Sequence, residues 1–139
     1  MASLEISFDA TRLDIDRVTQ WLSTDAYWSK GRSAELVRRS FANSLGIGAY
    51  VEGVQVGVAR LVTDSATFAW LCDVYVAPEA RGRGVGKALM DAVSSWSAEV
   101  EPKWVVLATE DAHGLYARHG FASLDPERWM GLRVRQGER

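Results

Sequence analysis

The sequence predicts a single α/β domain over residues 1–139, with a mixed central sheet of about six to seven strands flanked by about four helices. Segments with the two-residue period of strands alternate with segments of helical period, in the order β-α-α-β-β-β-α-β-α-β-β. The 139 residues are enough to bury one core without metal or disulfide support, and no repeat or linker divides them. These observations favour helices layered on one sheet.

The first elements are one strand and two helices. Residues 4–8 alternate between apolar and polar side chains, which predicts a short strand. Apolar residues at helical spacing predict helices over residues 15–22 and 36–45. The loop between these helices, residues 25–31, carries two adjacent aromatic side chains.

The middle of the chain supplies three strands and the longest helix. Two alternating runs, residues 46–51 and 54–63, are joined by a Glu-Gly pair, which predicts a tight hairpin. Residues 67–76 are almost continuously apolar, which is typical of a central strand covered on both faces. The apolar stripe of residues 85–100 then predicts a helix.

The last part of the chain completes the predicted sheet. Residues 104–108 predict another buried strand, and residues 112–118 predict a short helix that Gly120 ends. Apolar residues at Phe121 and over residues 130–134 predict the closing strands.

Charge and cysteine content exclude several classes of function. Sixteen Lys+Arg against 18 Asp+Glu give a formal charge of −2, which argues against bulk binding to nucleic acid or to an anionic membrane. Cys72 is the single cysteine, so the sequence excludes an intrachain disulfide and a Cys-based zinc site. Since neither a signal peptide nor a membrane span is recognised, we expect a cytoplasmic protein, and a homodimer is compatible with this composition.

A glycine-rich segment, residues 81–87, lies between the predicted central strand and the longest helix. The backbone N–H groups of such a loop and the positive end of the helix dipole favour an anion. The P-loop pattern does not fit, because Arg81 and Ala88 stand where it needs Gly and Ser or Thr. The dinucleotide-binding pattern does not fit either, because Lys87 stands where its third glycine belongs.

What remains is an R-x-x-G-x-G motif over residues 81–86, after a strand that ends Val74-Tyr75-Val76. This motif resembles the acyl-CoA pyrophosphate loop of the GNAT superfamily of N-acetyltransferases. A second segment, residues 115–121, is similar to that family's L-Y-x-x-x-G-F element. The two motifs, their strand–loop–helix setting and the matching order of elements extend the resemblance over nearly the whole chain.

The resemblance implies acetyl-CoA as the co-substrate, held largely by main-chain groups. The residues expected to bind it are Val74, Tyr75 and Val76 on the strand, Arg81, Gly82, Arg83, Gly84, Val85, Gly86 and Lys87 in the loop, and Thr109. For the cations of the loop, the alternative is a solvated surface charge. Thr109 stands where many relatives carry asparagine, and a helix-capping role is equally compatible with it.

Tyr116 matches the tyrosine that protonates the departing thiolate in this family. A phenol with a pKa of ~10 can donate a proton to a thiolate whose conjugate thiol has a pKa of ~8.5. The alternative is a structural tyrosine that packs the short helix.

The general base has two candidates, and each also has a structural interpretation. Asp73 is an acid in an apolar strand, so it is a base or amine anchor, or else a structural hydrogen-bonded carboxylate. His113 lies one helical turn before Tyr116 and is a second candidate base, although a lone histidine is usually structural. Glu110 and Asp111 are expected to be capping or solvated residues.

Aromatic residues are expected to form the acceptor site. Tyr27 and Trp28 in the first loop, with Trp70 and Trp129 near the mouth of the central strand, suit an aliphatic or cationic amine, and they equally suit plain packing. The resemblance thus predicts an N-acetyltransferase that moves an acetyl group to a primary amine of a small molecule or peptide by direct attack, without metal. The alternative is a non-catalytic acyl-CoA-binding or sensor module with the same fold.

Overall fold

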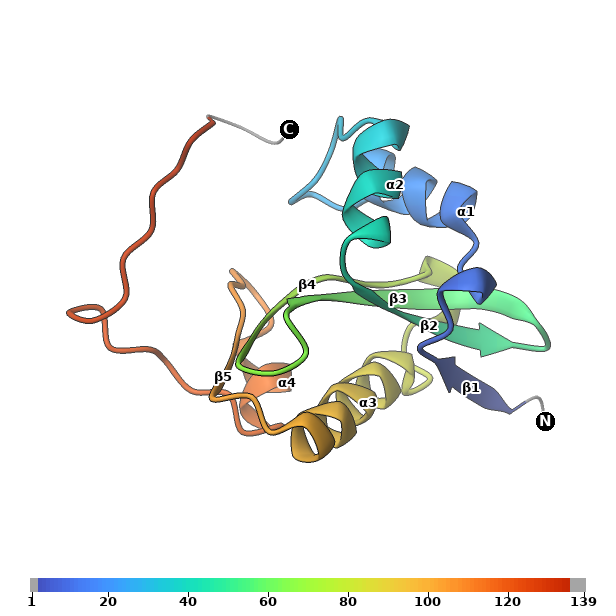
Figure 1. Ribbon diagram of the computed structural model, residues 1–139. Helices are drawn as coiled ribbons and strands as arrows, with labels where there is room; N and C mark the ends of the chain where they lie inside the picture. The colour runs from blue at the N-terminus through green and yellow to red at the C-terminus, as the bar shows by residue number, and fades with distance from the viewer. Residues whose placement is uncertain (1–2, 136–139) are drawn as a thin grey trace.

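The computed structural model describes residues 3–135, and a five-stranded sheet forms their centre (Figure 1). The strands lie in chain order across the sheet: β1 (Leu4–Ser7), β2 (Leu45–Val51), β3 (Val54–Thr63), β4 (Phe68–Val76) and β5 (Trp104–Val106). The first four are antiparallel neighbours, and β5 runs parallel to β4. The predicted α/β class with a mixed sheet is therefore confirmed.

Helices cover both faces of the sheet (Figure 1). On one face lie α1 (Ile15–Gln20), which continues as a π-helical turn over Trp21–Asp25, and α2 (Ala34–Ala42). On the other lie α3 (Val85–Val100) and the short α4 (His113–Ala117). The four predicted helices are confirmed, although α2 ends earlier than expected because Leu45 already belongs to β2. None of the described helices is long and apolar enough to cross a membrane.

A β-bulge bends β4 where the site lies. Arg60 of β3 pairs with Cys72, whereas Val58 pairs with Tyr75, so two residues of β4 oppose one residue of β3. One of these two is Asp73, whose φ of +52° lies in the left-handed region. The pairing of β4 with β5 covers only Phe68–Trp70, so the remainder of β4 has no strand beside it on that edge within residues 3–135.

The predicted closing strands are not formed, and the expected count of six to seven strands is wrong for the described residues. Phe121 packs against the core, but residues 122–135 contain neither helix nor strand, and the end of this segment runs away from the body as an extended arm (Figure 1). The alternation over residues 130–134 suits strand backbone, yet a strand also needs a neighbour to pair with. Along residues 3–135 the arm has none, and β5 remains at the edge of the sheet.

Candidate active site

The glycine loop leads from the end of β4 through a 3-10 turn at Pro78–Ala80 into α3. Gly82 and Gly84 have φ of +78° and +82°, which L side chains rarely adopt, so both glycines are required by the backbone. Gly84 is the N-cap of α3, and no side chain among the described residues bonds to the first turn in its place. The uncapped N–H groups and the helix dipole therefore offer a site for a phosphate-type anion.

Arg81 holds the loop against two other elements. Its Nε donates to the carbonyl oxygen of Val76 at 3.0 Å, and its guanidinium lies over the Tyr75 ring, 5.4 Å from Cζ to the centroid. Its Nη2 lies 3.7 Å from the Asp25 carboxylate, which also accepts a hydrogen bond from the Tyr75 hydroxyl. Burial, followed by the bond to Asp25 and its charge, raises the pKa of Tyr75 to about 12. Arg81 therefore ties the loop to β4 and to the end of the π-helical turn.

The other two cations of the loop, Arg83 and Lys87, are exposed. Lys87 Nζ lies 2.9 Å from Asp91 one turn further along α3, in an exposed ion pair. Their expected contact with a phosphate group stays a prediction.

A cavity of about 400 Å³ opens where β4 and the chain after β5 diverge. Its walls come from β4, from the segment that follows β5, from the loop before α2 and from α4. The cavity brings together seven of the predicted site residues, namely Tyr27, Trp28, Trp70, Asp73, Val74, Thr109 and Tyr116. Trp129 lies elsewhere, against Trp104 on the other side of β5.

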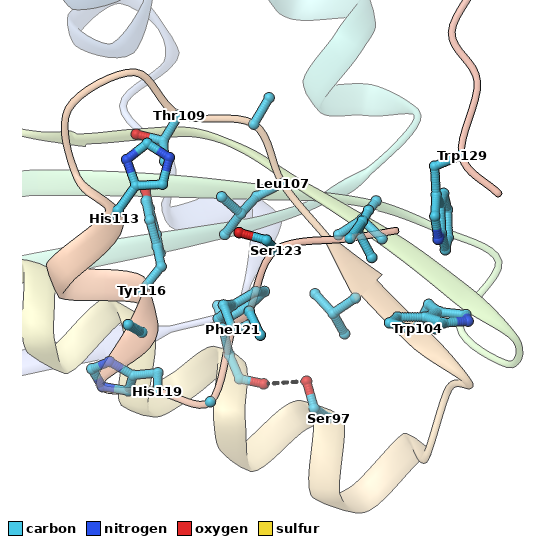
Figure 2. Close-up of a pocket in the computed structure, with 18 of the residues that line it drawn as sticks. Ser97, Trp104, Leu107, Thr109, His113, Tyr116, His119, Phe121, Ser123 and Trp129 are labelled. Carbon is cyan, nitrogen blue, oxygen red and sulfur yellow. Dashed lines mark hydrogen bonds between the residues drawn. The ribbon is translucent and has the colours of Figure 1, made fainter. Parts of the chain in front are cut away.

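Tyr116 is half-buried on α4, with its ring edge-to-face against Phe121 at 5.9 Å between centroids. Burial raises the pKa of Tyr116 above its ordinary value, and the charge of nearby Asp111 adds to the effect. The phenol is therefore protonated at neutral pH and able to donate. Figure 2 shows Tyr116 with Thr109 and His113 in one region of a second cavity, on the outer side of β5.

For Thr109 and His113, the functional and the structural interpretations both remain open. The Thr109 Oγ1 accepts from the backbone N–H of Ala112 at 3.1 Å, which is a capping bond ahead of α4. His113 is exposed at the start of α4 and lines the second cavity with Tyr116, but it is not among the residues around the smaller cavity. Its role as a base stays a prediction.

Asp73 is the centre of a buried charge cluster. Arg32 Nη1 lies 3.1 Å from both carboxylate oxygens, and Arg60 Nε donates to Oδ2 at 2.9 Å. Trp28 Nε1 donates to Oδ1 at 3.3 Å. The Asp73 side chain is 2% exposed, and those of Arg32 and Arg60 are 10% and 14% exposed. This arrangement fits a carboxylate that holds the cavity wall together, since both of its oxygens already accept bonds from cations.

Three charged residues of the cavity had not been predicted as site residues. Arg32 and Arg60 supply its cations, and the position of Arg60 as the one charged residue of a mostly apolar strand was a usable signal in the sequence. Asp111 is exposed and lines the cavity beside Tyr27. Burial is the main cause that raises the pKa of Tyr27, and the charge of Asp111 and its hydrogen bond add to it. The feature of the sequence that could have indicated Asp111 is its place in the loop that precedes Tyr116.

Cys72 lies next to the cluster and also lines the cavity. It is half-buried, and burial raises the pKa of its thiol to about 11. The thiol is therefore protonated at neutral pH and a poor nucleophile.

Comparison with known proteins gives consistent matches. The family described as "Acetyltransferase (GNAT) domain" matches residues 42–123. A Gibberella zeae protein described as an acetyltransferase is 30% identical, over 82% of this chain and 76% of its own length. A crystal structure assigned to the GNAT family, from Xanthomonas campestris pv. campestris, is 46% identical with a TM-score of 0.90, covering 96% of this chain and 95% of the other. An aminoglycoside N-acetyltransferase in complex with CoA shares the fold, at 17% identity with a TM-score of 0.67 and coverage of 98% and 97%.

Proposed function

The chain belongs to the GNAT family of acetyltransferases, and on that premise we propose that it transfers the acetyl group of acetyl-CoA to a primary amine of a small molecule or peptide. The observation that carries this proposal is that the glycine loop and the cavity lie at the same strand, β4. The uncapped, glycine-lined start of α3 follows the same strand whose unpaired edge opens the cavity containing Tyr116. In this proposal, the bound donor extends from an anion site at the loop, along the open edge of β4, to a proton donor in the cavity.

Each part of the donor has a matching part of the chain. The first-turn N–H groups after Gly84 would hold the pyrophosphate, because they are uncapped and lie at the positive end of a 16-residue helix. The main-chain groups of Val74 and the N–H of Val76 would hold the pantetheine arm, since β5 stops pairing at Trp70 and the Val76 carbonyl already accepts a bond from Arg81. When bound, acetyl-CoA supplies an activated acyl thioester.

Tyr116 is the proton donor in this proposal. Attack by the amine releases a thiolate, and a protonated phenol at the wall of the cavity can give it a proton. Membership in a family of acetyltransferases, together with a tyrosine at this position, favours an enzyme over a binding or sensor module.

The acceptor amine arrives as a cation and must lose a proton, which costs roughly 4 kcal/mol at neutral pH for an alkylammonium. We assign its attraction to Asp111, which is exposed at the cavity and beside the aromatic ring of Tyr27. Asp73 is assigned to positioning, because Arg32 and Arg60 already face its carboxylate. The proton then leaves through water at the cavity mouth.

The test is release of free thiol from acetyl-CoA in the presence of a panel of amines, amino acids and peptides. We expect thiol release with at least one cationic amine. In Asp111→Asn the KM for that amine should be about tenfold higher, because one charge-assisted contact is lost. Glu110→Gln is the matched control, because Glu110 is the neighbouring acid and does not line the cavity. Thiol release no faster than spontaneous hydrolysis across the whole panel would overturn the proposal.

A further inference from the structure

The cavity beside β4 carries charges of both signs, although a simple amine acceptor carries only a positive charge. The charged residues among those that line it are two arginines, Arg32 and Arg60, and two aspartates, Asp73 and Asp111. An alkylammonium group is attracted by carboxylates and repelled by guanidinium groups. Attraction of the amine therefore explains an aspartate in this cavity, but it does not explain the arginines.

The two arginines lie in the buried part of the cavity, where the side chain of Arg60 is 14% exposed. Arg60 Nε donates to Asp73 Oδ2 at 2.9 Å, and its Nη1 donates to the hydroxyl of Ser44 at 3.3 Å. Within residues 3–135, Asp73 is the only carboxylate that pairs with Arg60, and it also pairs with Arg32. Because one carboxylate is shared and the hydroxyl is neutral, the charge of Arg60 is only partly balanced and favours a second anion.

Asp111 lies in the exposed part of the same cavity, on the segment between β5 and α4. Burial is the main cause that raises the pKa of Tyr27 and of Tyr116, and the charge of Asp111 adds to the rise in both. The carboxylate of Asp111 is therefore near the proposed proton donor. The cavity thus has a buried part that favours an anion and an exposed part that favours a cation close to Tyr116.

We propose that the acceptor is a free amino acid, whose carboxylate binds Arg60 in the buried part of the cavity and whose amine lies at Asp111; this assignment rests on the proposed function. The planar N–H fork of a guanidinium matches a carboxylate, and the cavity volume of about 400 Å³ suits a small molecule.

The reaction stays that of the proposed function. The amine first loses a proton to water, its nitrogen then bonds to the acetyl carbon, and the C–S bond breaks. The departing thiolate takes a proton from Tyr116, which water replaces. The carboxylate takes no part in these steps and serves to hold the acceptor.

Thiol release from acetyl-CoA is measured with matched sets of acceptors, each consisting of a standard amino acid, its carboxamide and its decarboxylated amine. We expect at least one amino acid to exceed both of its analogues by at least tenfold in kcat/KM, because the analogues lack the carboxylate. The carboxamide also represents the N-terminus of a peptide. Analogues that are acetylated as well as their amino acids overturn the assignment and leave the proposed function intact, whereas no thiol release with any set overturns both.

The ratio of kcat/KM for the amino acid to kcat/KM for its carboxamide tests Arg60 itself. Arg60→Gln should lower this ratio at least tenfold, whereas damage to the fold alone would lower both values and leave the ratio unchanged.

Arg60→Lys keeps a charge beside Asp73 and provides the test if Arg60→Gln does not fold. It should also lower the ratio, because an ammonium lacks the planar fork. Arg17→Gln is the matched control and should keep the wild-type ratio, since Arg17 is also partly buried and ion-paired but lies outside the cavity. A wild-type ratio in a folded Arg60 variant overturns the assignment.

Discussion

Replacing Asp73 by asparagine isolates the charge of the carboxylate at the centre of the buried cluster. Asparagine has the same shape and tolerates the left-handed backbone that Asp73 adopts, so the bulge in β4 is kept. The change removes one negative charge that faces two guanidinium groups at 2.9 and 3.1 Å. It also removes the ability to accept a proton. Loss of a structural role should therefore lower the Tm, whereas loss of a chemical role should lower kcat/KM.

The burial of the cluster determines how much stability Asp73→Asn loses. The Arg32 and Arg60 side chains are 10% and 14% exposed, so water replaces the lost charge poorly. Removing one partner of a buried ion pair costs about 3–5 kcal/mol. For 139 residues with an unfolding entropy of about 2.1 cal/mol/K each, this lowers the Tm by about 10–17 °C.

Thermal unfolding and steady-state kinetics on the same preparation decide the outcome. Glu5→Gln is the control, because it breaks an exposed bidentate ion pair with Arg12, whose loss water largely compensates, and it should lower the Tm only slightly. We expect the large Tm shift in Asp73→Asn with kcat/KM within about tenfold of wild type below the melting range. A Tm as high as that of Glu5→Gln, together with a loss of at least about 100-fold in kcat/KM, would refute the positioning role and make Asp73 the base or amine anchor.

Three further predictions concern the donor site and the tyrosines. Acetyl-CoA at a hundredfold excess over its Kd should raise the Tm by about 9 °C. Gly84→Glu should abolish this rise, whereas the control Gly53→Glu, which also lies at a turn with positive φ and open space, should keep it. A rise that is retained in Gly84→Glu contradicts the loop assignment. Tyr116→Phe should lower single-turnover rates by ~10²–10⁴-fold with nearly unchanged affinity for acetyl-CoA, and an unchanged rate would leave Tyr116 a packing role. Because the pKa of Tyr75 is raised to about 12, its contribution to stability is present below pH 10 and is lost as the pH rises toward 12. Urea unfolding at pH 9 and 11 should show a smaller alkaline loss in Tyr75→Phe than in wild type, and equal losses would contradict the shift.

Features that depend on neighbours in the sequence were predictable. The Glu52-Gly53 hairpin, the long helix α3 and the glycine loop each rest on a local rule of backbone conformation or side-chain period, and each is found. The gathering of Tyr116 with the first-loop aromatics followed from the resemblance, because the order of elements implies the layers that bring them together.

Features that depend on distant partners were not predictable. Asp73 meets Arg32 from 41 positions away and Arg60 from 13, and no periodicity in one sequence selects those pairs. The alternation over residues 130–134 predicts a strand that the structure does not form, because pairing is a property of two strands and a single chain's sequence does not specify where the second one is. The bulge at Asp73 was not predicted either, although aspartate is enriched among the few non-glycine residues that adopt positive φ.

The raised pKa of Cys72 has a consequence for the chemical selectivity of the protein. A thiolate in the wall of an acyltransferase cavity would compete with the acceptor for the acyl group and leave the enzyme covalently modified. An ordinary thiol with a pKa of ~8.5 is about 3% ionised at pH 7, whereas a pKa of about 11 leaves roughly one thiol in ten thousand ionised. The burial that raises the pKa of Cys72 therefore protects the protein from self-acylation and from thiol oxidation, although a sulfur atom faces the same cavity as the proposed acceptor amine.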